Sequence, residues 1–173
     1  HNLREAQLLA LRAMGPVPEN LEELKEKITN EGPGDTLIPA CPLMHGTGLF
    51  TGMGTFYSGG TVVTLSAPSL DPEELWQTVQ DRGVNTVSIV GDAFAKPMLR
   101  ALENNQGRWD LSSLAGMISS GVMWSQEVKE ALLEHLPNAL LADSFGSSEA
   151  VGFGASIMAT LSACAATTLP TAN

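Results

Sequence analysis

Short apolar runs alternate with amphipathic helical patterns along most of this chain, and that alternation restricts its fold more than any other feature. The apolar runs predict strands and the patterns between them predict helices: strands at 61–65, 85–90, 114–119 and 139–145, and helices at 71–83, 91–103 and 125–135. Strands that alternate with helices pair in parallel through right-handed crossovers. We therefore predict an α/β fold in which helices flank a mostly parallel β-sheet.

Local signals at the ends of the predicted helices support this assignment. Asp71 stands before a proline, which is typical of a helix start, and Ser125 is predicted to cap the helix that follows it. Asn20 is a further candidate cap. Upstream, the sequence predicts one more strand at Thr36–Ala40 and a helix at Leu3–Met14.

Polar, glycine-rich segments follow the predicted strands at Cys41–Gly48, Ser119–Ser125 and Ser144–Gly152. Parallel sheets bind ligands beyond the carboxyl ends of their strands. We expect the functional site at these segments, each of which is predicted to be a turn.

The segment from Asp143 to Glu149 has the groups that a nucleotide needs. Phe145 offers an aromatic face to a base, the serine hydroxyls and backbone N–H groups suit phosphate, and Glu149 suits Mg²⁺. Short Gly/Ser turns are also common between the elements of α/β folds. Taken by itself, the segment is equally compatible with a turn that carries a solvated glutamate.

The other two segments are less specific by themselves. The backbone of Ser119–Ser125 suits the edge of a planar base, although an ordinary loop with Trp124 as packing fits as well. His45 is the only one of three histidines in a plausible site, but a lone histidine is more often structural than catalytic. No serine triad, zinc motif or Cys/His cluster is apparent.

Six glycines lie between Cys41 and Gly60, at positions 46, 48, 52, 54, 59 and 60. Each glycine in a helix costs roughly 1 kcal/mol relative to alanine. The close approach of a ligand or of another backbone is the usual compensation for that cost.

Charge and hydropathy exclude several classes of function. The net charge is −10 and the cations are scattered, so a nucleic-acid backbone is an unsuitable partner. No apolar run is long enough for a transmembrane segment, and no signal peptide is visible. Cys41 and Cys164 have unrelated surroundings, which predicts reduced thiols. These features predict a soluble, cytoplasmic protein.

Together these segments resemble the adenylate-forming superfamily and, within it, the AMP-forming fatty-acid–CoA ligases. The resemblance covers roughly Asn2–Gly154 and is carried, in order, by PLMHGTGLFTGMG (42–54), SIVGDAFAKPMLRAL (88–102), LAGMISSGVMWSQEVKEALLEHLP (114–137) and DSFGSSEAVG (143–152). It implies that a fatty-acid carboxylate attacks ATP to form an acyl-adenylate, from which CoA displaces AMP. ATP, AMP, CoA and Mg²⁺ are the ligands that it implies. The VMWS run favours long fatty acids or sterol side-chain acids as the carboxylate.

The resemblance also implies roles for individual residues. Phe145 would pack on adenine, Ser148 would contact the α-phosphate, and Glu149 would bind Mg²⁺. His45 would orient the carboxylate at the mouth of the acyl pocket, and it is a catalytic candidate together with Ser148 and Glu149. Further nucleotide-binding candidates are Ser120, Gly121, Val122, Asp143, Ser144, Gly146 and Ser147. Room for the acyl chain would come from Gly48, Gly52 and Gly54.

Parts of the family pattern are not found in this sequence. We find no phosphate loop ending in Pro-Lys-Gly, no ribose-binding aspartate and no mobile domain with a catalytic lysine. We therefore interpret residues 1–154 as the central α/β part of the large N-terminal domain of such an enzyme. Residues 155–173 form a low-complexity tail, either disordered or not native. We predict that the 173-residue chain by itself does not adenylate a carboxylate.

Two alternatives stay open at this point. A fatty-acyl-AMP ligase would stop at the adenylate and would share these motifs. A non-catalytic nucleotide- or lipid-binding module would keep the turns without needing a catalytic lysine. Whatever the function, a sheet cut at both ends exposes strand edges and apolar helix faces, which predicts self-association of the chain.

Overall fold

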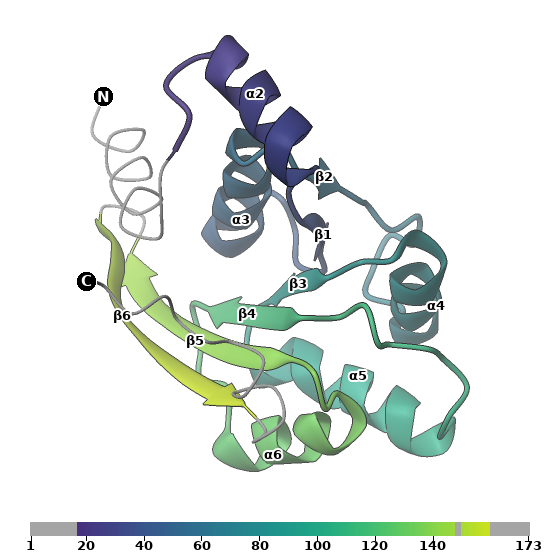
Figure 1. Ribbon diagram of the computed structural model, residues 1–173. Coiled ribbons are helices and arrows are strands. Elements are labelled where there is room, and N and C mark those ends of the chain that lie inside the picture. The colour runs from purple at the N-terminus through teal and green to yellow at the C-terminus, as the bar shows by residue number, and fades with distance from the viewer. Residues whose placement is uncertain (1–16, 148–149, 160–173) are drawn as a thin grey trace, which may run out of the picture.

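The computed structural model describes residues 17–147 and 150–159, in which helices and strands alternate as predicted as far as residue 147 (Figure 1). The elements in chain order are α2 (Leu21–Glu31), β1 (Thr36–Pro39), α3 (Gly46–Tyr57), β2 (Thr61–Val62), α4 (Pro72–Arg82), β3 (Thr86–Ile89), α5 (Asp92–Asn104), β4 (Gly116–Ser120), α6 (Gln126–His135), β5 (Leu140–Ser147) and β6 (Ala150–Ala159). The predicted helix at 3–14 lies outside the described residues.

One six-stranded sheet has the order β2-β1-β3-β4-β5-β6. All neighbouring strands pair in parallel except β5 and β6, which form an antiparallel pair. The α/β class with a mostly parallel sheet is thereby confirmed. In the β4–β5 ladder, Ser119 lies opposite Asp143 and Ser120 opposite Ser144. The segment after β4 therefore begins beside Ser144, within β5.

Helices cover both faces of the sheet. Val87 and Ile89 of β3 are fully buried in the core cluster that includes side chains of α4, α5 and α6. Ser88 between them faces the other way, because successive strand residues point to opposite faces. Its hydroxyl accepts a hydrogen bond of 2.9 Å from Thr51 of α3. Helix α3 therefore packs on the face opposite to α4–α6.

The helix starts follow the predicted capping chemistry in two cases out of three. Asn20 accepts from the N–H of Glu23 at 3.0 Å, and Asp71 accepts from the N–H of Glu73 at 2.9 Å. Ser125 is the wrong prediction: it precedes α6 but makes no side-chain cap bond. Its hydroxyl instead donates to Asp92 Oδ1 at 3.1 Å. A carboxylate within reach competes successfully with the helix end for that hydroxyl.

Two other boundaries differ from the predictions. Strand β2 ends at Val62 rather than at 65. The predicted turn at 144–152 is mostly strand instead. Strand β5 runs on to Ser147, and β6 begins at Ala150, so most of 144–152 is strand. Antiparallel backbone pairing with β6 keeps this segment extended as far as Ser147. The boundary expected at 154 falls inside β6.

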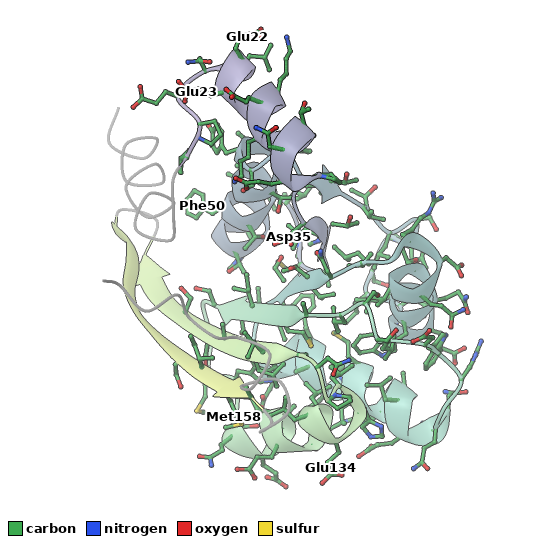
Figure 2. All side chains as sticks on the ribbon, viewed as in Figure 1. Glu22, Glu23, Asp35, Phe50, Glu134 and Met158 are labelled. Carbon is green, nitrogen blue, oxygen red and sulfur yellow. The ribbon has the colours of Figure 1, made fainter. Side chains whose placement is uncertain are left out.

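Among the described residues, every charged side chain except Lys129 is exposed or half-buried. Figure 2 shows Glu22 and Glu23 at one end of the molecule on α2 and Glu134 at the other end on α6. Within residues 17–147 and 150–159, no helix combines the length and apolar character that crossing a membrane requires. Cys41 is a free, buried cysteine, and its burial raises the pKa of its thiol. Cys164 lies outside the described residues.

Candidate functional site

The segments after β1, β3 and β4 meet at the carboxyl end of the sheet. Thr47, at the start of α3, donates its hydroxyl to the carbonyl oxygen of Ser120 at 3.3 Å. Gly91, after β3, donates its N–H to the buried hydroxyl of Ser119 at 2.9 Å. Both bonds end on β4, which lies next to β5. The end of β4 is therefore held from two directions. We call residues 120–125, which are the last residue of β4 and the loop after it, the β4 loop.

His45 and Gly121 are in direct contact across this site. Gly121 has a φ of +97°, and a Cβ placed on it would lie 3.1 Å from His45 Cε1 and 3.4 Å from His45 Nε2. Glycine leaves the space that the imidazole occupies and tolerates this backbone conformation. The structure thus brings together two candidates that are 76 positions apart in the sequence.

The ring of His45 has a structural role and one free group. Its Nδ1 accepts from the N–H of Thr47 at 3.2 Å and so caps α3. In the neutral ring this acceptor places the proton on Nε2, the nitrogen that lies against Gly121. The residue as a whole is exposed.

Gly91 and Asp92 form a corner that holds the β4 loop and that sequence reasoning missed. A Cβ on Gly91 would lie 2.5 Å from Val122 Cγ2 and 2.6 Å from the carbonyl oxygen of Met123. Asp92 Oδ1 accepts from the N–H and the hydroxyl of Ser125 at 2.9 and 3.1 Å. A Gly-Asp pair directly after a buried strand was the available signal, but nothing local identifies its partner 33 residues later.

The electrostatics of this corner favour the ionised carboxylate. Partial burial acts to raise the pKa of Asp92, but hydrogen bonds from Ser125 and the interaction with Lys96 outweigh it, so the pKa is lowered. The Lys96 ammonium lies 3.0 Å from Asp92 Oδ2. Both oxygens of Asp92 are therefore engaged at neutral pH.

The candidates on β5 divide into described and undescribed groups. Asp143 is half-buried, and its Oδ2 lies 3.2 Å from the ammonium of Lys129. Ser144 is half-buried opposite Ser120. Only the strand backbone is described for three further candidates, Phe145, Gly146 and Ser147. Ser148 and Glu149 lie outside the described residues.

The three glycines proposed to face the acyl chain all lie on α3 and are buried. Gly48 has an internal reason to be glycine, because a Cβ there would lie 2.9 Å from the carbonyl oxygen of Pro42. Gly52 has no such reason among the described residues, since the nearest atom to a Cβ there is Val62 Cγ2 at 4.0 Å. Position 52 therefore tests ligand space more cleanly than position 48.

Exposed apolar side chains lie next in the chain to both His45 and Gly121. The loop before α3 exposes Leu43 and Met44, and the β4 loop exposes Val122 and Met123. Met44 is 94% exposed, which is unusual for a side chain of this size.

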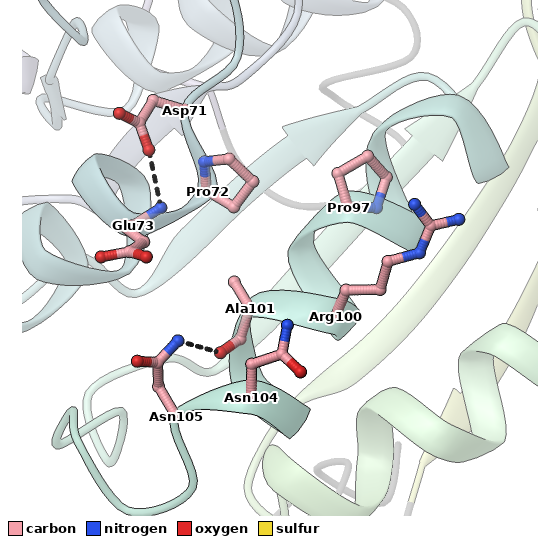
Figure 3. A pocket seen from close by; sticks show the side chains of 8 residues that line it. All are labelled: Asp71, Pro72, Glu73, Pro97, Arg100, Ala101, Asn104 and Asn105. Carbon is pink, nitrogen blue, oxygen red and sulfur yellow. Dashed lines mark hydrogen bonds between the residues drawn. The ribbon is translucent and has the colours of Figure 1, made fainter.

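No group of three or more His, Cys, Asp or Glu side chains that could hold a metal occurs within residues 17–147 and 150–159. A separate hollow of about 450 Å³ lies between the start of α4 and the second half of α5 (Figure 3). Its lining is mostly polar and includes Asp71, Glu73 and Arg100. It contains none of the candidate site residues.

Known proteins match this chain in both sequence and fold. The AMP-binding enzyme family matches residues 10–172. The 3-oxocholest-4-en-26-oate–CoA ligase of Rhodococcus rhodochrous is 38% identical over 128 residues, which are 72% of this chain and 22% of that protein. A medium/long-chain-fatty-acid–CoA/3-oxocholest-4-en-26-oate–CoA ligase of Mycobacterium marinum is 42% identical over 116 residues, which are 67% of this chain and 20% of that protein.

A solved structure shares the fold at low identity. The N-terminal domain of FACL13 from Mycobacterium tuberculosis superposes with a TM-score of 0.61 and 18% identity, over 78% of this chain and 32% of that one. The chain spans about a fifth of the length of the two curated relatives. On the family match and these relatives, the chain belongs to the family of AMP-binding enzymes.

Proposed function

We propose that this chain is the central part of an AMP-forming acyl-CoA ligase, which activates a fatty-acid or sterol side-chain carboxylate with ATP and transfers it to CoA. The names of the two curated relatives, which act on such acids, support the substrate class. The contact between His45 and Gly121 is the observation that carries the proposal. It joins the candidate for the acyl carboxylate to the loop proposed to lie beside adenine.

In the reaction, a carboxylate oxygen attacks the α-phosphorus of ATP, and pyrophosphate leaves with the electrons of the broken P–O bond. The CoA thiol then attacks the acyl carbon and releases AMP. The Nε2–H of His45 would donate to the carboxylate and orient it beside Gly121. The backbone of Gly121 and the exposed side chain of Val122 would flank the adenine.

The phosphate side of the proposed site depends on residues of the β5–β6 connection. Ser148 would donate its hydroxyl to the α-phosphate, and Glu149 would hold Mg²⁺, which neutralises phosphate charge as the P–O bond forms. Phe145 would pack on the adenine, with Ser144, Gly146 and Ser147 lining the nucleotide. These roles are the ones that the DSFGSSEAVG motif (143–152) implies.

Calorimetry with a non-hydrolysable acyl-adenylate analogue tests this proposal on the 173-residue chain. We expect the analogue to bind more tightly than the fatty acid or AMP alone, because it occupies both sides of the His45–Gly121 contact. Mg²⁺ should strengthen binding of ATP, and Glu149→Ala should abolish that dependence. Tight, metal-independent binding of lipid with no contribution from the adenosine would contradict the proposal and favour a lipid-binding module.

Alanine at position 52 is expected to separate stability from ligand binding. Gly52→Ala should stabilise the chain by up to about 1 kcal/mol, because α3 gains helix propensity without a clash. The same methyl should weaken binding of the acyl-adenylate analogue if Gly52 leaves room for the acyl chain. Urea unfolding and calorimetry measure the two effects.

Gly48→Ala is the matched control on the same helix. Its methyl would press on the carbonyl of Pro42, so it should destabilise the chain. If Gly52→Ala stabilises the chain and leaves affinity for every acyl length unchanged, Gly52 does not line the acyl site.

A further inference from the structure

A buried lysine lies beside the proposed nucleotide site. Of the side chains that the structure describes, Lys129 is the only charged one that is buried, at 7% exposed. It is on α6, next to the buried Val128 and one turn before the buried Leu132 and Leu133. An apolar residue would satisfy this position at lower cost, because a buried ammonium loses its hydration.

The partners of Lys129 come from two different walls of the site. Its ammonium lies 3.2 Å from Asp143 Oδ2 on β5 and 5.4 Å from the ring centre of Trp124 in the β4 loop. Trp124 is itself 2% exposed, so its ring is fixed in the core. Asp143 keeps 25% of its side chain exposed and lies opposite Ser119 in the ladder.

From these contacts we infer that Lys129 is a positioning residue, which fixes the orientation of Asp143 relative to the β4 loop. The inference rests on the proposed function, since both walls are assigned there to the nucleotide. The ladder between β4 and β5 sets the backbone spacing, but it leaves the Asp143 carboxylate free to rotate. The ion pair holds Oδ2 toward α6 and so presents Oδ1 in one direction. A charged partner provides this orientation, which an apolar side chain cannot.

Three lysine variants test the inference. Lys129→Met keeps the aliphatic stem and removes the charge, Lys129→Arg keeps the charge, and Lys25→Met is the control in an exposed helix ion pair with Glu22. Calorimetry gives the dissociation constants for the acyl-adenylate analogue and for the fatty acid alone. Amide hydrogen exchange measures protection at 119–125 and 143–147 without any ligand.

We expect Lys129→Met to weaken binding of the analogue by about tenfold or more and to change fatty-acid binding by less than about twofold. Exchange should accelerate at both segments but not in β1 or β3. Lys129→Arg should restore both readouts, and Lys25→Met should match the parent. If Lys129→Met fails to fold, Lys129→Gln should give the same pattern with a smaller amplitude.

Unchanged protection at both segments in the folded charge-removing variant would overturn the inference. An equal loss of affinity for the analogue and for the fatty acid would also overturn it, because it would indicate general destabilisation. If the parent chain does not bind the analogue, the proposed function fails. The exchange measurement still decides whether Lys129 orders the two segments.

Discussion

Gly91→Ala is expected to destabilise the chain by about 3 kcal/mol or more, from backbone strain and steric overlap together. Gly91 has φ 57° and ψ −156°, a conformation that side chains with a Cβ rarely adopt. The new methyl would also lie 2.6 Å from the carbonyl oxygen of Met123, a backbone atom that cannot rotate away. The β4 loop must therefore move, and affinity for the acyl-adenylate analogue should fall with stability. Urea unfolding and calorimetry measure the two effects.

Gly83→Ala is the matched control for this prediction. Gly83 also has a positive φ of 57°, but no atom lies within 4 Å of a Cβ built there. Only the conformational cost applies, which is about 1 kcal/mol. Equal losses of stability at the two positions would show that the contact between Gly91 and the β4 loop is unimportant.

Asp92→Ala is expected to cost about 2–3 kcal/mol at neutral pH, because two hydrogen bonds from Ser125 and the ion pair with Lys96 are lost. The exposed Asp110, which accepts from the N–H of Ser112 at 3.0 Å, provides the control. Asp110→Ala should change stability less, since solvent can replace its partner. Of these two variants, only Asp92→Ala should weaken binding of the analogue, because Asp92 contacts the β4 loop and Asp110 does not.

The stability that Asp92 contributes should depend on pH in a defined direction. Its pKa in the folded chain is lowered from the ordinary value of 3.8. The folded state therefore favours the ionised form, and the contribution is fully present above the unfolded pKa. It is lost as the pH falls through the folded pKa. The stability difference between the parent and Asp92→Ala should be constant near neutrality and should shrink below about pH 4. A difference that stays constant into strong acid would contradict the role of the carboxylate.

Local chemistry made several elements predictable from the sequence. Asp71 before Pro72 marked the start of α4, and the apolar run at 85–90 marked β3, because capping and burial both depend on residues near in the chain. His45 and the residues of the β4 loop were also chosen as candidates from the sequence, through their motifs. The motifs did not predict the contact between them, since it depends on how two loops pack across the sheet.

The predictions that were wrong also depended on contacts between residues far apart in the chain. Ser125 was predicted to cap α6, but Asp92 from another helix takes its hydroxyl. The small residues after Asp143 predicted a turn. Pairing with β6 keeps the chain extended as far as Ser147. In both cases a partner distant in sequence decided between two local conformations of similar energy.

The sequence by itself determined the α/β class, the order of the elements and the family, because strand–helix periodicity and short motifs are properties of neighbouring residues. Only the tertiary structure decided which of the candidate groups lie next to one another. It placed His45 against Gly121, Gly91 against Val122 and Met123 of the β4 loop, and Lys129 between Trp124 and Asp143. Those contacts arise from strand order and helix packing, which bring together residues that carry no local sign of one another.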